Sequence, residues 1–117
     1  MERTVGEVIA ASRAMERLCE QDLSYDVNIG YRMLKFRDEL MSVSDYAISR
    51  IGKVVDLEHT DNEQYVMLFD VLMAQTVEIP DVTLTEGEVF GPKNGEVTLS
   101  LSDTEAILRM FSPDKHQ

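Results

Sequence analysis

The sequence lacks several features that mark familiar classes of protein. Its 117 residues include one cysteine, no tryptophan and three prolines. A single cysteine, Cys19, cannot form a disulfide within the chain, which argues against the small disulfide-stapled secreted class. The residues after Met1-Glu2-Arg3 contain no apolar run long enough for a signal peptide. We therefore expect a cytoplasmic protein.

Positive charge is also scarce. Eleven bases face twenty-two acids, giving a net charge of -11 and a pI near 4.4. A chain this acidic is not expected to bind a nucleic-acid backbone or an anionic membrane. The imbalance lies in the second half: residues 1–56 have ten acids and eight bases, a net of -2, while residues 57–117 have twelve and three, a net of -9.

The remaining composition is that of an ordinary globular domain. Hydrophobic residues make up 44% and charged residues 28% of the chain, which excludes wholesale disorder. The length fits one domain with a single core, covering residues 1–117. Within it, residues 1–56 are predicted to form a helical hairpin and residues 57–117 an acidic α+β part, with a loose tail at 112–117.

The first helix is predicted to begin at a capping box. Thr4 and Glu7 have the spacing at which each side chain accepts a hydrogen bond from the other residue's backbone amide. Apolar residues then recur at steps of three and four, forming one helical face. They are Val5, Val8, Ile9, Ala11, Met15, Leu18 and Cys19. The helix is expected to end near Gln21.

The second helix carries the strongest pattern. An apolar column repeats every seven residues, and apolar residues precede its last four members. The column is Val27, Leu34, Met41, Ile48 and Val55, and the preceding residues are Met33, Leu40, Ala47 and Val54. Such a rod is on the order of 45 Å long at about 1.5 Å per residue, too long for the first helix to cover. Either the C-terminal half or a second protomer must cover the rest, and the residues predicted for self-association are Met33, Leu40, Met41 and Ile48.

Mixed structure is predicted after residue 56. A capping box at Thr60–Glu63 opens a third helix that should end by Thr76. Alternation at Val77–Ile79, Val82–Leu84 and Val97–Leu101 predicts a small β-hairpin, whose strands pair within one chain or between subunits. Turns are expected at residues 86–88 and 91–95, followed by a capping box at Ser102–Glu105. That box opens a short helix with Ala106, Ile107, Met110 and Phe111 inward. The predicted fold class is mainly α with an α+β C-terminal part.

Residues suited to catalysis do not form a known pattern. The segment Glu58–Glu63 places His59 among carboxylates, but it has neither the spacing of a calcium loop nor that of a zinc helix. We expect this segment to be a solvated loop. The alternative is that it forms the metal site of a metal-dependent enzyme. Cys19 falls on an apolar helical face and is expected to be a core residue. The sequence therefore predicts no catalytic residue, no cofactor and no metal.

The acidic half offers the main candidate for partner binding. Seven acids lie between Val77 and Glu105 against Lys93 alone, a local net of -6. The residues predicted to bind a basic protein partner are Glu78, Asp81, Glu86, Glu88 and Glu96. The field of such a surface is weakened by salt. Mimicry of nucleic-acid phosphates and a simple contribution to solubility are the alternatives.

Several segments resemble a family of small bacteriophage-encoded proteins of unassigned function. The likeness rests on the N-terminal helical hairpin, Glu63–Phe69, Val77–Ile79 and the closing Leu101–Glu105 helix start with Met110-Phe111. The chain departs from the lysine-rich hairpin of such proteins, having only Lys35 and Lys53 there. The resemblance implies a phage or prophage accessory protein in the host cytoplasm. It would be a non-enzymatic module that modulates a host protein, such as an inhibitor of host defence or nucleic-acid machinery, or alternatively a minor structural or assembly factor of a virion.

Overall fold

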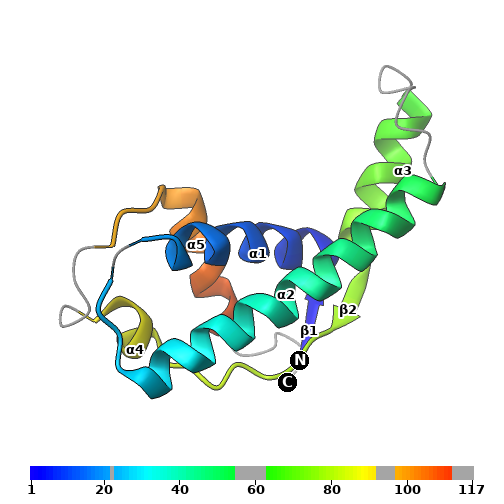
Figure 1. The fold of residues 1–117 in the computed structure, drawn as a ribbon. Coiled ribbons are helices and arrows are strands. Elements are labelled where there is room, and N and C mark those ends of the chain that lie inside the picture. Colours follow the sequence, from blue (N-terminus) through cyan, green and yellow to red (C-terminus); the bar gives the residue numbers. More distant parts are fainter. Residues whose placement is uncertain (22, 55–62, 92–96, 112–117) are drawn as a thin grey trace.

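The computed structural model describes residues 1–21, 23–54, 63–91 and 97–111. These residues form five helices and a two-stranded antiparallel sheet (Figure 1). In chain order the elements are β1 (Glu2–Thr4), α1 (Val5–Cys19), α2 (Val27–Val54), α3 (Glu63–Ala74), β2 (Thr76–Glu78), α4 (Glu86–Phe90) and α5 (Leu101–Phe111). The prediction of a mainly helical protein with a small β part is confirmed.

Helix α1 begins as its sequence predicts. The Thr4 hydroxyl accepts from the Glu7 amide, and the Glu7 carboxylate accepts from the Thr4 amide, both at 3.1 Å. These bonds satisfy two of the amides that a helix start leaves without partners. The helix ends at Cys19, slightly before the expected Gln21. Its buried face includes Val8, Met15 and Leu18, and Ser12 is buried among them.

Helix α2 is unbroken from Val27 to Val54, which confirms the predicted long rod. Its start is held by Asp26, whose carboxylate accepts from the Asn28 amide at 2.9 Å. The helix runs antiparallel to α1, because its early residues pack with the end of α1 and its late residues with the start (Figure 1). The predicted helical hairpin is therefore present.

The core of the molecule surrounds α1, which contacts both α2 and α5. Met15 and Leu18 of α1 share one hydrophobic cluster with Leu40 of α2 and with Ile107 and Met110 of α5. Ile79 and Leu84, between β2 and α4, and Val89 of α4 belong to the same cluster. We call this part the body, comprising α1, residues 27–44 of α2, the sheet, α4 and α5.

The predicted β-hairpin is wrong. β2 pairs with β1, so that Arg3 lies opposite Val77, and the strand predicted at Val97–Leu101 is not a strand. Residues 97–100 have no helix or strand, and Leu101 begins α5. β1 pairs with β2, and the Gln21 side chain bonds the backbone carbonyl and amide of Thr98, groups that a strand at 97–101 would use for its own pairing. Val82–Leu84 also lies outside any strand.

The helix boundaries after β2 differ from the prediction in two places. The expected turn at residues 86–88 is part of α4, which a capping box between Thr85 and Glu88 initiates. α5 begins one residue before the predicted capping residue Ser102, and the Ser100 hydroxyl accepts from the Asp103 amide at 3.1 Å. Ile107 and Met110 are buried as expected. The capping box at Thr60, the turn at 91–95 except Gly91, and the tail at 112–117 lie outside the described residues.

The last third of α2 and α3 form a helical pair that projects from the body (Figure 1). We call residues 45–54 and 63–74 the arm. At its base a second hydrophobic cluster joins Val5 and Ile9 of α1 to Ala47 and Ile51 of α2. Three residues of α3 pack against that cluster: Phe69, Leu72 and Met73. The arm thus packs on the body through Ala47 and Ile51 of α2 and through one face of α3.

Candidate functional site

The acidic residues predicted to bind a partner are dispersed by the fold. Glu78 at the end of β2, Asp81 after it and Glu86 at the start of α4 are exposed, and we call these three residues the acidic edge. Glu88 is half-buried, and Glu96 lies outside the described residues. Only part of the predicted acidic surface is therefore open to a partner.

Two residues of the acidic edge already have a cationic neighbour. The amino group of Met1 donates to Glu78 Oε1 at 3.0 Å, to Asp81 Oδ1 at 3.1 Å and to the Ile79 carbonyl at 2.7 Å. The hydrogen bonds to Glu78, and then to Asp81, raise the pKa of that amino group. The negative electrostatic field near Glu78 and Asp81 is therefore weaker than the number of acidic residues in the sequence implies.

Glu88 has a structural contact that removes it from the predicted surface. Arg32 Nη2 donates to Glu88 Oε2 at 2.7 Å, and Arg32 Nη1 donates to the Thr83 carbonyl at 2.7 Å. The hydrogen bond from Arg32, supported by the backbone amide of Thr85, lowers the pKa of Glu88. Glu88 therefore fastens α4 to α2.

The four residues predicted for self-association separate onto different faces of α2. Met33 and Leu40 are only 2% and 1% exposed, because α1 packs over them. Met41 is half-buried, while Ile48 is 45% exposed. A helix turns by about 100° per residue, so neighbours in the sequence point in different directions. As placed here, Met33 and Leu40 belong to the core and are not available to a second copy.

The outer column of α2 remains partly open along its length. Val27, Leu34 and Ile48 are 88%, 45% and 45% exposed, and Tyr31 is also exposed. Polar residues lie among them, including the exposed Lys35, Asp38 and Asp45. This outer column is therefore a mixed surface rather than a continuous apolar ridge.

The most concentrated apolar surface lies on α3 and was not predicted. Val66, Met67 and Val71 are 49%, 69% and 59% exposed, and Leu68 is 37% exposed. We call these four residues, which surround the exposed side of α3 together with the exposed Asp70, the α3 face. Asp70 is the only charged residue from 66 to 74. This composition could have indicated an exposed apolar side. Residues 66–74 are apolar on both sides of the helix, whereas packing on α1 and α2 covers only one side.

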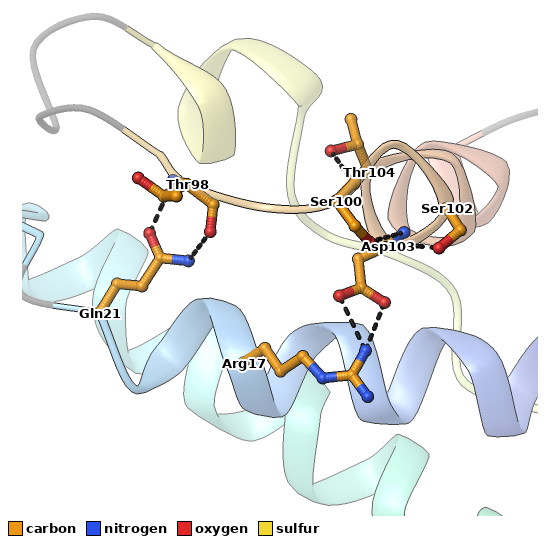
Figure 2. Close-up of polar contacts among 7 residues, drawn as sticks. All are labelled: Arg17, Gln21, Thr98, Ser100, Ser102, Asp103 and Thr104. Carbon is orange, nitrogen blue, oxygen red and sulfur yellow. Dashed lines mark hydrogen bonds and ion pairs between the residues drawn. The ribbon is translucent and has the colours of Figure 1, made fainter.

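A polar seam joins α1 to the start of α5 (Figure 2). Arg17 Nη1 donates to both carboxylate oxygens of Asp103, at 2.6 and 2.8 Å. Gln21 donates to the Thr98 carbonyl at 2.6 Å and accepts from the Thr98 amide at 2.9 Å. The acceptors of Asp103 and the amide of Gln21 are thus engaged by the protein itself. The seam positions α5 on α1.

Cys19 has the environment of a structural residue. It is half-buried at the end of α1. Burial raises the pKa of its thiol, and the positive charge of Arg37 offsets only part of that effect. A thiol with a raised pKa is mostly protonated near neutral pH, which makes it a weak nucleophile.

No metal or reactive centre emerges from the residues that the structure describes. Within residues 1–21, 23–54, 63–91 and 97–111, no group of three or more histidine, cysteine or carboxylate residues is arranged to hold a metal ion. Residues 58–62, including His59, and the tail residue His116 lie outside those ranges. An open groove of about 330 Å³ between α1 and α5 is lined in part by Gly6, Ala10 and Ala106. The rest of its lining is polar: Thr4, Glu7, Ser102, Glu105 and Arg109. Of these, Glu7 bonds Thr4 in the capping box, and Arg109 donates to Glu105.

Comparisons with known proteins do not assign the chain to a family. No protein-family model matches it, and no curated protein and no solved structure matches it. Among the described residues, no helix combines the length and the apolar character that crossing a membrane requires. The α3 face is therefore the candidate functional site on physical grounds.

Proposed function

We propose that this chain is a non-enzymatic protein–protein interaction module whose α3 face binds another protein surface. The observation that carries the proposal is the exposure of four neighbouring large apolar residues on one short helix. Scattered apolar residues are normal on a protein surface, but a contiguous patch marks an interaction site. The partner surface is expected to be apolar and to accept a helix.

The position of the α3 face supports this proposal. The arm projects from the body, so a partner can approach α3 without meeting α4 or α5 (Figure 1). Phe69, Leu72 and Met73 hold the helix from its other side. A helix fixed in this way loses little conformational freedom on binding, which favours affinity.

Site-specific photo-cross-linking in the natural host tests the proposal. A photoreactive residue placed at Met67, which is 69% exposed, should capture a defined protein. The matched control is the same residue at Val27, which is 88% exposed on the opposite end of α2. If both positions give the same adducts, the α3 face is not a specific binding surface.

The setting proposed is that of a phage or prophage accessory protein, as the resemblance noted above implies. Of the two roles considered from the sequence, the α3 face favours assembly through apolar helix contacts, as in a minor virion component. Such contacts need no charge on the partner. A modulator of a host protein is the other role, and cross-linking distinguishes them by whether the adduct is a virion or a host protein.

A second surface, the acidic edge, supports binding of a basic partner. Glu86 is exposed near Glu78 and Asp81 along the chain, and none of the three lies in the core. Affinity for the cross-linked partner should then fall as salt rises from about 50 to about 200 mM, and Glu86→Gln should reduce that dependence. Glu16→Gln, an exposed acid on α1, is the control. Salt-independent affinity would leave the α3 face as the sole binding surface.

A further inference from the structure

We propose that the outer edge of β2 binds an extended peptide segment with basic side chains, which adds to the sheet as a third strand. This inference rests on the proposed function, because it names the kind of partner that the acidic edge takes. In such strand addition the backbone of the ligand bonds the sheet edge, and its alternate side chains give specificity. The α3 face is not part of this site.

The hydrogen bonds between β1 and β2 determine which backbone groups the sheet leaves over. The Ile79 amide donates to the Met1 carbonyl at 2.9 Å, and the Met1 amino group donates to the Ile79 carbonyl at 2.7 Å. In an antiparallel pair, such bonded positions alternate with positions whose amide and carbonyl point away from the partner strand. Val77 is therefore the next bonded position of β2. The amides and carbonyls of Thr76 and Glu78 point outward.

The outer edge of β2 is the open edge of this sheet. The sheet formed by the described residues has two strands, so each strand has one outer edge. On β1 that edge is partly engaged, because the Glu2 carbonyl accepts from the next residue's guanidinium at 2.7 Å and the Thr4 amide donates within the α1 capping box. In the part of the chain that the structure describes, no hydrogen bond engages the outward groups of Thr76 and Glu78. Both residues are exposed.

This open edge is short and has defined ends. On one side α3 ends at Ala74, two residues before Thr76. On the other side Pro80 occupies the next outward position, and proline has no amide to donate. The edge therefore offers two amides and two carbonyls, which repeat every two residues, or about 6.8 Å. An extended chain matches that spacing, whereas a helix has already bonded its own backbone groups.

The charge beside this edge favours a basic segment. Glu78 and Asp81 are exposed, and the sequence has no base from Gln75 to Thr85. The amino group of Met1 balances one of these two charges, so negative charge remains. In a third strand, the Cβ of the residue beside Glu78 would lie roughly 5 Å away, where opposite charges attract and like charges repel. A second copy of this chain would bring its own acids to the edge and is disfavoured for that reason.

The two faces of the sheet define the pattern expected in the ligand. Val77 is half-buried and packs against both hydrophobic clusters, whereas Thr76 and Glu78 are exposed. Side chains alternate between faces along a strand, so a third strand would point alternate residues toward the body and toward water. We expect apolar residues at the first positions and lysine or arginine at the second. A capped peptide of six alternating lysine and valine residues is therefore the probe for this site.

Amide hydrogen exchange, followed by NMR on the full chain, tests the inference residue by residue. In the free protein the amides of Val77 and Ile79, which bond β1, should exchange more slowly than those of Thr76 and Glu78. With the peptide at ten times its dissociation constant, exchange at Thr76 and Glu78 should slow by about tenfold. The Ile79 amide is the internal control and should change little. Unchanged exchange at Thr76 and Glu78 with about 5 mM peptide would overturn the inference.

Modified peptides separate backbone bonding from charge. N-methylation of alternate residues removes the donors on one edge of an extended peptide and keeps its charge. Of the two alternating patterns of methylation, one should raise the dissociation constant by about tenfold or more, and the other should have little effect. A peptide with glutamate in place of lysine should also bind about tenfold more weakly or worse. If both methylated peptides bind as tightly as the parent, charge alone attracts the peptide and the inference is wrong.

A variant of the protein tests the role of Glu78. Glu78→Gln removes the charge and keeps an oxygen that can accept from Met1, and it should weaken the lysine peptide by about threefold or more at low salt. Glu16→Gln, at an exposed acid on α1, is the control and should leave the dissociation constant unchanged. Circular dichroism and urea unfolding establish that both variants fold. An equal effect of the two variants would show that only net charge matters and would overturn the inference.

Two outcomes separate this inference from the proposed function. If Met67 cross-links to a defined protein while the peptide leaves exchange at Thr76 and Glu78 unchanged, the α3 face remains a binding surface and the inference about β2 is wrong. If the peptide binds β2 while Met67 captures no protein, the inference holds and the α3 face is not a binding surface. Protection of Thr76 and Glu78 that rises with protein concentration, without peptide, would mean that a second copy occupies the edge, and it would overturn the inference.

Discussion

In the body, α1 is covered by α2 and by α5, whereas in the arm α3 is covered through one face only. Both helices are rich in apolar residues, yet Leu18 of α1 is fully buried and Met67 of α3 is 69% exposed. The difference is one of neighbours rather than of composition. α1 is covered on both sides in the body, whereas part of the apolar surface of α3 in the arm is exposed.

The two regions also differ in charge. Residues 45–74, which are the arm and the segment that joins its two helices, have six acids and two bases, a net of -4, and the rest of the chain carries the other -7. The acidic edge belongs to the body side of the molecule, where Met1 partly balances it.

The largest effect is expected from the core of the body. Leu40→Ala shortens a side chain that is 1% exposed and should lower the free energy of unfolding by about 2–5 kcal/mol. The substitution leaves a cavity that the surrounding side chains close only in part. Leu34→Ala on the outer column of α2, at 45% exposure, should cost about 1 kcal/mol or less. Urea unfolding at low protein concentration measures both. Equal losses would contradict the separation of α2 into inner and outer columns.

A smaller effect is expected within the arm. Leu72→Ala affects the face of α3 that packs on the body and should cost about 1–2 kcal/mol, as a half-buried leucine. Its neighbour Val71 is exposed, and Val71→Ala should change the stability of the monomer by no more than about 0.5 kcal/mol. Thermal unfolding compares the two. A large loss for Val71→Ala would mean that the α3 face is already covered within one chain.

The polar seam is expected to contribute about 1 kcal/mol. Asp103 is mostly buried, with a side chain 12% exposed, while the Arg17 side chain is 57% exposed, so solvent screens part of their attraction. A double-mutant cycle with Arg17→Ala and Asp103→Ala measures the coupling. The Glu105 and Arg109 pair, 62% and 58% exposed, is the control and should couple by no more than about 0.5 kcal/mol. Coupling of equal size in both pairs would show that the seam has no special role.

The smallest effect is a pH dependence at Glu88. Its pKa is lower in the folded chain than its ordinary value of 4.5 because Arg32 donates to it. Ionised Glu88 therefore stabilises the folded chain at pH values above 4.5. This contribution is lost as the pH falls through the lower pKa that Glu88 has in the folded chain. Unfolding followed between about pH 6 and pH 3 should lose less stability in Glu88→Gln than in the natural chain. The control Glu86→Gln keeps Glu88 in place, and identical profiles for both variants would argue against the Arg32 contact.

The sequence correctly predicted the elements that depend on residues close together in the chain. The Thr4 and Glu7 capping box and the unbroken α2 depend on neighbouring residues and on one repeat, and the structure confirms both. The pairing of β1 with β2 depends on residues more than seventy positions apart. Three-residue strands carry too little alternation to indicate their partner, so the sequence favoured a local hairpin instead.

The candidate site depended on how the helices dock. The columns through Met33 and Leu34 are equally apolar, and only the position of α1 decides which one is buried. Likewise, the charged residues near Glu88 do not reveal that Arg32 lies beside it. The α3 face could have been predicted from the sequence, because the residues from Val66 to Ala74 are apolar on more of the helix surface than packing on one side covers.

The central place of α1 has a consequence for how the chain is made. During synthesis α1 emerges about ninety residues before Ile107 and Met110, which share its hydrophobic cluster. A ribosome-bound chain that ends before Leu101 therefore leaves one side of α1 exposed to water. Folding of the body must wait for α5, and termination before α5 would yield an aggregation-prone fragment rather than a smaller stable domain.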